Sequence, residues 1–160
     1  MKIAVMSDTH GNVDLAVNAI RQLGRIDKLI HLGDHYKDAM EIGKKTKIPV
    51  DAVAGNTDVD LYPSVLREKI IELRGTRILI MHGDMYKVKQ GLNYLLAKAV
   101  SEDVQIALFG HTHFPMKQRI GKILFLNPGC ILTDNSNNSC ATLTWVRDKV
   151  EGKLIPLDAR

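Results

Sequence analysis

The sequence is poor in cysteine and aromatic residues, and it contains no long apolar run. Its two cysteines among 160 residues, Cys130 and Cys140, do not form a C-x-x-C motif. This count disfavours a disulfide scaffold and favours reduced thiols in a cytoplasmic protein. No stretch approaches the roughly 20 apolar residues of a membrane-spanning helix. Residues 1–3 lead directly into strand-like sequence without a secretory signal pattern. We therefore expect a cytoplasmic protein with no membrane partner.

The chain also lacks the features of a nucleic-acid-binding surface. Aromatic residues make up 5% of the sequence, the formal net charge is +4 and the isoelectric point is near 9.1. The basic residues are dispersed rather than clustered, and no basic patch with interleaved aromatic residues is evident. The charge suits a small anionic ligand such as a phosphate ester, and a nucleic-acid partner is not indicated.

The first part of the chain has the alternating pattern of an α/β fold. Short apolar runs at residues 3–6, 27–32 and 50–54 predict strands, and helices are expected at 12–24 and 36–45. Asn12 is a candidate N-cap of the first helix, and Gly24 is a candidate stop signal. Strands that alternate with helices favour a parallel sheet.

The second part of the chain changes to short strands and turns. The pattern predicts strands at 67–73, 77–81 and 104–109, a helix at 87–100, a hairpin of 115–119 with 122–126, an alternating strand at 139–147, and a final hairpin around Glu151-Gly152 within 150–157. Two stacked sheets with helices outside satisfy both parts. The absence of internal repeats and linkers predicts one domain over residues 1–160.

Polar clusters follow five of the apolar runs. They are Asp8-Thr9-His10, Gly33-Asp34-His35, Gly55-Asn56-Thr57-Asp58, His82-Gly83-Asp84 and Gly110-His111-Thr112-His113. Sites in α/β sheets gather at the carboxyl ends of the strands, so these clusters are expected to share an edge. One histidine at a strand end is best explained as a hydrogen-bonded residue. Five clusters of imidazole, carboxylate and amide together indicate a metal site.

The order D-x-H, G-D, G-N-x-D, H-G, G-H-x-H resembles that of the calcineurin-like metallophosphoesterase superfamily. The similarity is strongest to its small single-domain bacterial and archaeal phosphodiesterase branch. The resemblance implies a four-layer sandwich of two mixed β-sheets flanked by helices. It also implies two divalent metal ions, with manganese expected and iron, zinc or nickel compatible with the nitrogen and oxygen ligands. One ion would be held by Asp8, His10, Asp34 and His113, and the other by Asp34, Asn56, His82 and His111. Asp34 would bridge the two ions, because one carboxylate has two oxygens.

The activity that the resemblance implies is hydrolysis of a small phosphodiester by a metal-bridging hydroxide. The catalytic candidates are Asn56, Thr57, Asp58 and His111. The larger family often has histidine at the position of Thr57, where it is thought to protonate the leaving group. A hydroxyl can bind a phosphate oxygen but is a poor general acid at neutral pH. Asp58 either braces this loop or is an ordinary turn-forming aspartate.

Two other functions compete with this reading. The same architecture serves as a protein-interaction scaffold in the retromer subunit, a eukaryotic relative thought to have little catalysis. The complete set of seven ligands favours an enzyme. The lack of histidine at position 57 keeps the scaffold function as an alternative. A nuclease is placed last, because such relatives usually carry extra domains. The antiparallel end of the chain also offers a surface for a homo-oligomer, as small relatives often self-associate.

Several further residues allow two interpretations each. His31 lies inside an apolar strand and is best explained as a buried histidine with one partner. His35 and Asp84 adjoin ligand positions and could belong to the site or to the surface. Asn127 belongs to an Asn-Pro-Gly-Cys segment similar to the family's N-P-G-S. It could orient Asp8, contact substrate, or form an ordinary turn.

Overall fold

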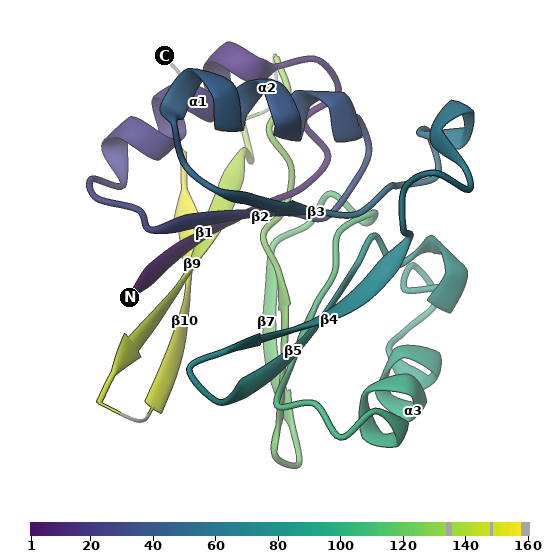
Figure 1. Ribbon diagram of the computed structural model, residues 1–160. Coiled ribbons are helices and arrows are strands. Elements are labelled where there is room, and N and C mark those ends of the chain that lie inside the picture. The colour runs from purple at the N-terminus through teal and green to yellow at the C-terminus, as the bar shows by residue number, and fades with distance from the viewer. Residues whose placement is uncertain (134–135, 148, 158–160) are drawn as a thin grey trace.

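Two five-stranded sheets pack face to face, with helices on both outer sides (Figure 1). The computed structural model describes residues 1–133, 136–147 and 149–157. One sheet has the strand order β10-β9-β1-β2-β3, and the other has the order β4-β5-β6-β8-β7. The elements are β1 (Lys2–Met6), α1 (Val13–Gln22), β2 (Lys28–His31), α2 (Tyr36–Thr46), β3 (Val50–Ala52), η1 (Val59–Leu61), β4 (Glu68–Leu73), β5 (Thr76–Met81), η2 (Asp84–Tyr86), α3 (Asn93–Ser101), β6 (Ile106–Leu108), β7 (Met116–Ile120), β8 (Ile123–Asn127), β9 (Ser139–Val146) and β10 (Lys149–Pro156). The predicted four-layer sandwich of two mixed sheets is confirmed.

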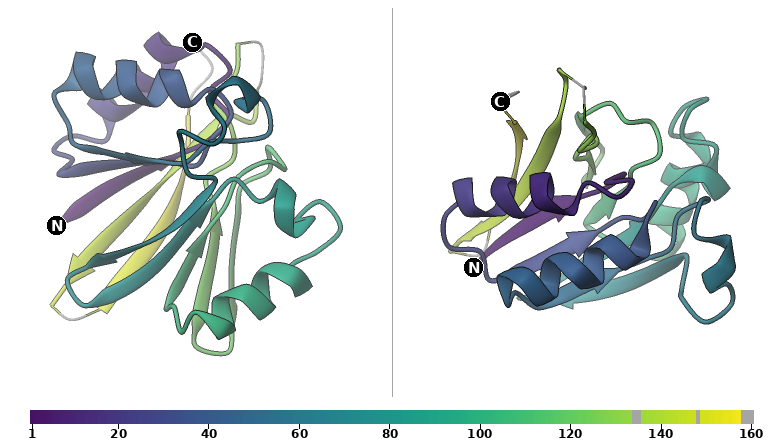
Figure 2. Two further views of the ribbon diagram at one scale, coloured as in Figure 1. Left: turned by 45° about the vertical axis from the view of Figure 1, so that its right-hand side comes forward. Right: turned by 90° about the horizontal axis from the view of Figure 1, so that it is seen from above.

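The central strands are buried on both faces, which explains their unbroken apolar runs. In β1, Ile3 and Val5 point into the core between the two sheets. Ala4 and Met6 alternate with them and pack under α1 and α2. The second sheet divides its side chains in the same way, with α3 covering the outer face of β5, β6 and β8 (Figure 2). Because successive side chains of a strand point to opposite faces, each sheet contributes to the core between the sheets and to a second core under its own helices.

The pairing of the strands brings the predicted ligand loops to one region. Strands β1, β2 and β3 are mutually parallel, and so are β5, β6 and β8. The polar clusters follow β1, β2, β3, β5 and β6, so every one of them leaves the carboxyl end of a parallel strand. The two sheets therefore present their ligand loops at a shared edge.

The helix expected at 87–100 begins later than predicted, at Asn93. Lys87 and Gly91 have φ values of 50° and 132°, which a right-handed helix cannot accommodate. Val88 is nevertheless buried against the same outer face of the sheet. The apolar spacing predicted the buried face correctly, but the left-handed conformations of Lys87 and Gly91 interrupt the helix.

The hairpin expected around Glu151-Gly152 is also wrong. Strand β10 continues through both residues, with Glu151 opposite Thr144 and Gly152 opposite Leu143 in β9. A Cβ at Gly152 would lie 3.2 Å from the side chain of Leu124 in the other sheet. This glycine therefore allows close packing of the sheets rather than a turn.

The start of α1 differs in detail from the predicted cap. Asn12 stands at the N-cap position, but its side chain accepts no hydrogen bond from the helix. Its amide instead donates to the carbonyl oxygen of Thr9 at 2.8 Å. Gly24 has a φ of 74° and ends the helix as expected.

None of the helices in the described ranges has the length and apolar character needed to cross a bilayer.

Candidate metal centre

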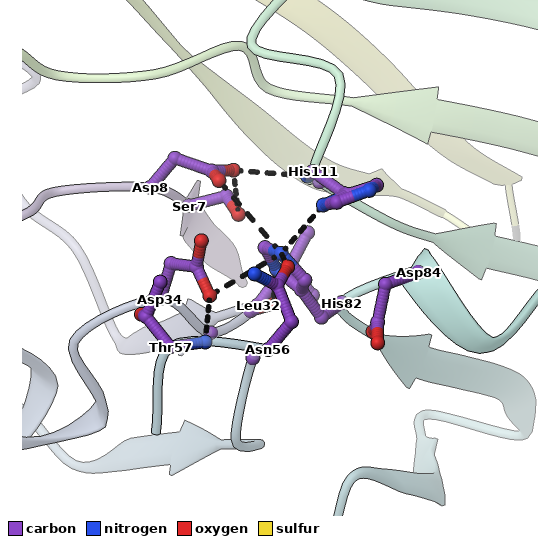
Figure 3. A network of polar contacts seen from close by, with 12 residues as sticks. Ser7, Asp8, Leu32, Asp34, Asn56, Thr57, His82, Asp84 and His111 are labelled. Carbon is purple, nitrogen blue, oxygen red and sulfur yellow. Dashed lines mark hydrogen bonds and ion pairs between the residues drawn. The ribbon is translucent and has the colours of Figure 1, made fainter. Parts of the chain in front are cut away.

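The five polar clusters meet at the shared edge of the sheets, and they bring all seven predicted ligands together. Figure 3 shows Asp8, Asp34, Asn56, His82 and His111 of this set. The first group of side chains surrounds Asp8. Its Oδ1 lies 3.1 Å from Nε2 of His113 and 4.0 Å from Nε2 of His10. These three residues could hold one cation through a carboxylate oxygen and two imidazole nitrogens.

The second group surrounds His82. Its Nε2 lies 3.0 Å from Oδ1 of Asn56, 3.2 Å from Nδ1 of His111 and 3.4 Å from Oδ1 of Asp34. The other oxygen of Asp34, Oδ2, lies 3.7 Å from Nε2 of His10 in the first group. The two oxygens of Asp34 therefore face different ligand groups.

The unsatisfied atoms of this cluster fit a cation better than a hydrogen-bond network. Oδ1 of Asp8 and Nε2 of His10 are buried without a hydrogen bond of acceptable geometry. Nδ1 of His82 lies 3.0 Å from the carbonyl oxygen of Leu32, so this nitrogen carries the proton in the neutral ring. The lone pair of Nε2 then faces two side-chain oxygens, an arrangement that is repulsive unless a positive charge lies among them.

The backbone around the ligands is held in an uncommon conformation. Five predicted ligands have positive φ values between 43° and 66°: Asp8, His10, Asp34, His111 and His113. Non-glycine residues in this region cost about 1–3 kcal/mol each, and such strain persists where the surrounding structure over-determines it. The concentration of strain at these residues is typical of a functional site.

Two glycines let the ligand loops approach one another. A Cβ at Gly110 would lie 1.9 Å from Oγ of Ser7 and 2.7 Å from Oδ2 of Asp8. A Cβ at Gly55 would lie 2.1 Å from Oδ1 of Asp34. Any other residue at either position would push a carboxylate out of place.

Hydrogen bonds from backbone and side chains orient the two carboxylates. Oδ2 of Asp8 accepts hydrogen bonds from the hydroxyl of Ser7 and from the backbone N–H of His111, the latter at 3.1 Å. Oδ1 of Asp34 accepts from the backbone N–H of Thr57 at 3.1 Å. In Asp8 one oxygen makes these bonds and the other faces His113 and His10. In Asp34 the bonded Oδ1 also faces His82, while Oδ2 faces His10.

The pKa values of Asp8, His10 and His111 favour metal-binding protonation states, whereas that of His113 favours the protonated ring. Burial raises the pKa of Asp8, but the neighbouring His113, His82 and Ser7 outweigh it, so the pKa lies below its usual value. Burial lowers the pKa of His10 and also that of His111, where the charge of His82 contributes. The pKa of His113 is raised because its ring lies against Asp8. Ionised carboxylates and neutral imidazoles are the forms that coordinate metals.

Asp58 braces the loop that carries Asn56. Its carboxylate is buried and accepts the backbone N–H of Gly55 and that of Tyr36, both at 2.8 Å. The hydroxyl of Tyr62 donates to the carbonyl oxygen of Gly55 from the other side. Asp58 thus ties this loop to the start of α2.

Asn127 and Asp84 hold neighbouring loops. The Asn127 amide donates to the carbonyl oxygen of Gly110 at 2.9 Å and to Oγ1 of Thr112 at 3.0 Å. It therefore orients the loop of His111 and His113 rather than Asp8. Asp84 forms an ion pair with Arg67, and its carboxylate points away from the ligands in Figure 3.

Sequence reasoning missed Asp38 in α2, which is 8% exposed. Its Oδ2 accepts hydrogen bonds from Oγ1 of Thr9 and from the backbone N–H of Gly11, both at 2.7 Å. The sequence signal for Asp38 was a carboxylate beside Ala39 and Ile42, on the face of α2 that the apolar spacing buries.

His35 lies near the surface, with its ring centroid 5.2 Å from that of His10.

Residues 1–148 match the family model described as "Calcineurin-like phosphoesterase superfamily domain". The chain belongs to this superfamily. A "Probable metallophosphoesterase" of Methanocaldococcus jannaschii is 34% identical over 163 residues, covering 99% of this chain and 82% of that protein. Another, YsnB of Bacillus subtilis, is 29% identical over 133 residues, covering 82% and 75%.

Solved structures of proteins with the same fold align with this chain over most of their length. A predicted phosphoesterase from Streptococcus pneumoniae aligns with a TM-score of 0.78 at 28% identity, covering 97% of this chain and 88% of that one. Vps29 from Entamoeba histolytica, solved in complex with zinc, aligns with a TM-score of 0.71 at 21% identity, covering 98% and 99%. The likeness to Vps29 shows the shared fold alone.

Proposed function

We propose that this protein is a dinuclear metal-dependent phosphoesterase that hydrolyses small phosphodiesters. The observation that carries the proposal is the placement of Asp34. One of its oxygens lies 3.4 Å from His82 and the other lies 3.7 Å from His10, so a single carboxylate reaches both ligand groups. A bridging carboxylate of this kind is what holds two cations close together.

Each ion has its own protein ligands in this proposal. One ion would be held by Asp8, His10 and His113, the other would be held by Asn56, His82 and His111, and Asp34 would be shared. The ions would stabilise the negative charge on the phosphoryl group and lower the pKa of a water nucleophile. Manganese suits this set of nitrogen and oxygen donors, which contains no thiolate. Cys130 and Cys140 are both buried and contribute to neither ligand group.

The chain's own residues fix the donor atoms before any substrate arrives. Asp8 and Asp34 are each held by hydrogen bonds to one oxygen, and His82 is oriented by the carbonyl oxygen of Leu32. This preorganisation reduces the reorganisation needed when ions and phosphate bind. In this proposal Asn56 and His111 would hold the second ion, and Asp58 positions Asn56 through the loop it braces.

A preference for diesters with good leaving groups follows from Thr57. Its side chain is exposed at the site, and its hydroxyl can donate a hydrogen bond to a phosphate oxygen. It is a poor proton donor at neutral pH, so departure of the alcohol depends on the alcohol's own acidity. Activated aryl esters are therefore the substrates expected to turn over fastest.

The test is manganese-dependent release of p-nitrophenol from bis(p-nitrophenyl) phosphate. The wild type is expected to be stimulated by Mn²⁺, and Asp34→Asn is expected to lose at least about 10²-fold in rate. Asp14→Asn is a matched control, because Asp14 pairs with surface Lys45 and its side chain is 87% exposed. Wild-type activity that is absent or independent of metal would contradict the proposal.

The competing proposal is a metal-binding scaffold with little catalysis. It is supported by the fold shared with Vps29 and by the threonine at position 57. The same assay separates the two proposals when it is paired with calorimetric titration of Mn²⁺. Binding of two ions without turnover would favour the scaffold.

A further inference from the structure

A buried chain of hydrogen bonds runs beneath the metal centre and joins two of its ligand loops. Its central member is His31 at the end of β2, whose side chain is 0% exposed. Nε2 of His31 lies 3.1 Å from Oγ1 of Thr9, which lies between Asp8 and His10. Nδ1 of His31 lies 3.3 Å from the backbone N–H nitrogen of Gly33, the residue before Asp34.

Counting donors and acceptors fixes the proton on His31. The backbone N–H of Gly33 can only donate, so Nδ1 of His31 must be the acceptor. The carboxylate of Asp38 accepts the hydroxyl proton of Thr9 at 2.7 Å and also the backbone N–H of Gly11. The Thr9 hydroxyl has only one proton, so its oxygen must accept a hydrogen bond from Nε2–H of His31. The ring is therefore neutral, with its proton on Nε2.

This arrangement uses every polar atom of the ring and connects segments far apart in the sequence. Thr9 and His31 are 22 residues apart, and Thr9 and Asp38 are 29 residues apart. A buried hydrogen-bond network in which every member is satisfied holds its parts rigidly. An apolar residue at position 31 would leave the Gly33 N–H without this acceptor and the Thr9 oxygen without this donor.

We propose that His31 is a positioning residue that sets the spacing between the Asp8–His10 loop and the Asp34 loop. Its ring hydrogen-bonds to Thr9 on one side and to Gly33 on the other, and it acts through these two residues. The proposed dinuclear site requires Asp8 and His10 from the first loop to share an ion with Asp34 from the second. A change in the spacing of these loops separates the ligands of that ion.

The expected effect is on metal affinity. Residues that orient metal ligands commonly change affinity roughly 10- to 100-fold when they are replaced. We expect His31→Leu, which removes both hydrogen bonds, to weaken Mn²⁺ binding by this factor. His31→Gln can still donate to Thr9, and His31→Asn can still accept from Gly33, so each should lose less than His31→Leu.

Calorimetric titration of the metal-free protein with Mn²⁺ at pH 7.5 measures this directly. The matched control is Ile30→Val, which removes one buried methylene from the neighbouring residue in the core between the sheets. Circular dichroism confirms that each variant is folded at the titration temperature. Should His31→Leu fail to fold, the Gln and Asn variants decide the question.

A double-mutant cycle with Thr9→Val tests whether the two residues act as one unit. Thr9→Val keeps the shape of the side chain but removes the hydroxyl that links His31 to Asp38. If the chain acts as proposed, Thr9→Val weakens Mn²⁺ binding by itself. Combining it with His31→Gln then costs less than the product of the two separate fold-changes.

The inference rests on the dinuclear site proposed above, but it is tested by metal binding rather than by turnover. A wild type that binds two ions without hydrolysing esters would overturn the proposed activity and leave the role of His31 intact. Mn²⁺ affinities for all three His31 variants within twofold of the Ile30→Val control would overturn the role of His31 while the hydrolase stands. Fewer than two bound ions in the wild type would overturn both.

Discussion

The backbone N–H of His111 donates a 3.1 Å hydrogen bond to Oδ2 of Asp8 across 103 residues of sequence. This bond fastens the first ligand loop to the last one and joins the edges of the two sheets. It also occupies one oxygen of Asp8 and leaves the other facing His10 and His113. The spacing of the first ligand group therefore depends on close contact between two backbone segments.

Replacement of Gly110 tests this close contact. A Cβ at this position would meet the side chains of Ser7 and Asp8 at 1.9 and 2.7 Å, so Gly110→Ala must displace the Asp8 carboxylate. We expect a loss of about 1–3 kcal/mol in the free energy of unfolding, and at least about tenfold weaker Mn²⁺ binding. Urea unfolding and calorimetry measure the two effects. Ser7→Ala is the comparison, because it removes a hydrogen bond without adding volume. Equal effects of the two variants would contradict the steric explanation.

Removal of the Asp58 carboxylate should destabilise the fold. Asp58→Ala would leave the backbone N–H groups of Gly55 and Tyr36 without their acceptor in a buried region. Hydrogen bonds to a charged group are worth about 1.5–3 kcal/mol each, so we expect the loss of both to cost about 3–6 kcal/mol in urea unfolding. Asp60→Ala in the same loop is the control. Its side chain is 62% exposed in a pair with Lys37, and its removal should cost far less than that of Asp58. A similar cost for both variants would show that Asp58 is not the brace.

The meeting of the candidate ligands could be predicted from the sequence because each belongs to a short local cluster at the end of an apolar strand, while their assignment to two ions rests on the resemblance to the family. The edge rule for parallel strands then places such clusters together without further information. The hydrogen-bond chain through His31 could not be predicted in this way. Its partners Thr9 and Asp38 are distant in the sequence, and only the docking of α2 on the sheet brings them together.

The two errors in the predicted secondary structure have a physical cause as well. Glycine commonly marks a turn, but at position 152 it removes a side chain between two packed sheets. The predicted helix at 87–100 includes Lys87 and Gly91, because apolar spacing indicates which residues are buried but carries no information about the sign of φ. Both errors arise where packing between layers decides the local conformation.

The stability of the metal-free protein should depend on pH through His31. Burial lowers the pKa of His31 to about 4 from 6.5, although the carboxylates of Asp8, Asp38 and Asp58 act in the opposite direction and His82 adds to the lowering. Between these two pKa values the unfolded chain binds a proton that the folded chain excludes. The free energy of unfolding therefore falls as the pH falls, by roughly 3 kcal/mol from this group alone.

The measurement is urea unfolding in EDTA at pH 7.0 and pH 4.5, for the wild type and His31→Gln. Other titrating groups contribute to both proteins, so the difference between their pH dependences isolates His31. We expect the wild type to lose more stability than the variant over this interval. Parallel pH dependences would mean that His31 accepts a proton in the folded state.

Restoring an imidazole at position 57 should relax the dependence on the leaving group. The backbone N–H of Thr57 binds Asp34 and is retained in any substitution, so Thr57→His changes only the exposed side chain. General acid catalysis contributes about 10²-fold or more. We expect Thr57→His to accelerate alkyl esters by about that factor and activated aryl esters far less. The check is a plot of log rate against leaving-group pKa for a series of diesters, with Thr57→Val as control. A wild-type rate that is already flat along this series would contradict the assigned role of Thr57.

The bridging role of Asp34 is tested most directly by an anomalous difference map from crystals grown with Mn²⁺. The account predicts two peaks roughly 3.5–4 Å apart, with one oxygen of Asp34 at each peak. Asp8, His10 and His113 should surround the first peak, and Asn56, His82 and His111 the second. A single peak, or two peaks of which Asp34 touches only one, would contradict the dinuclear centre.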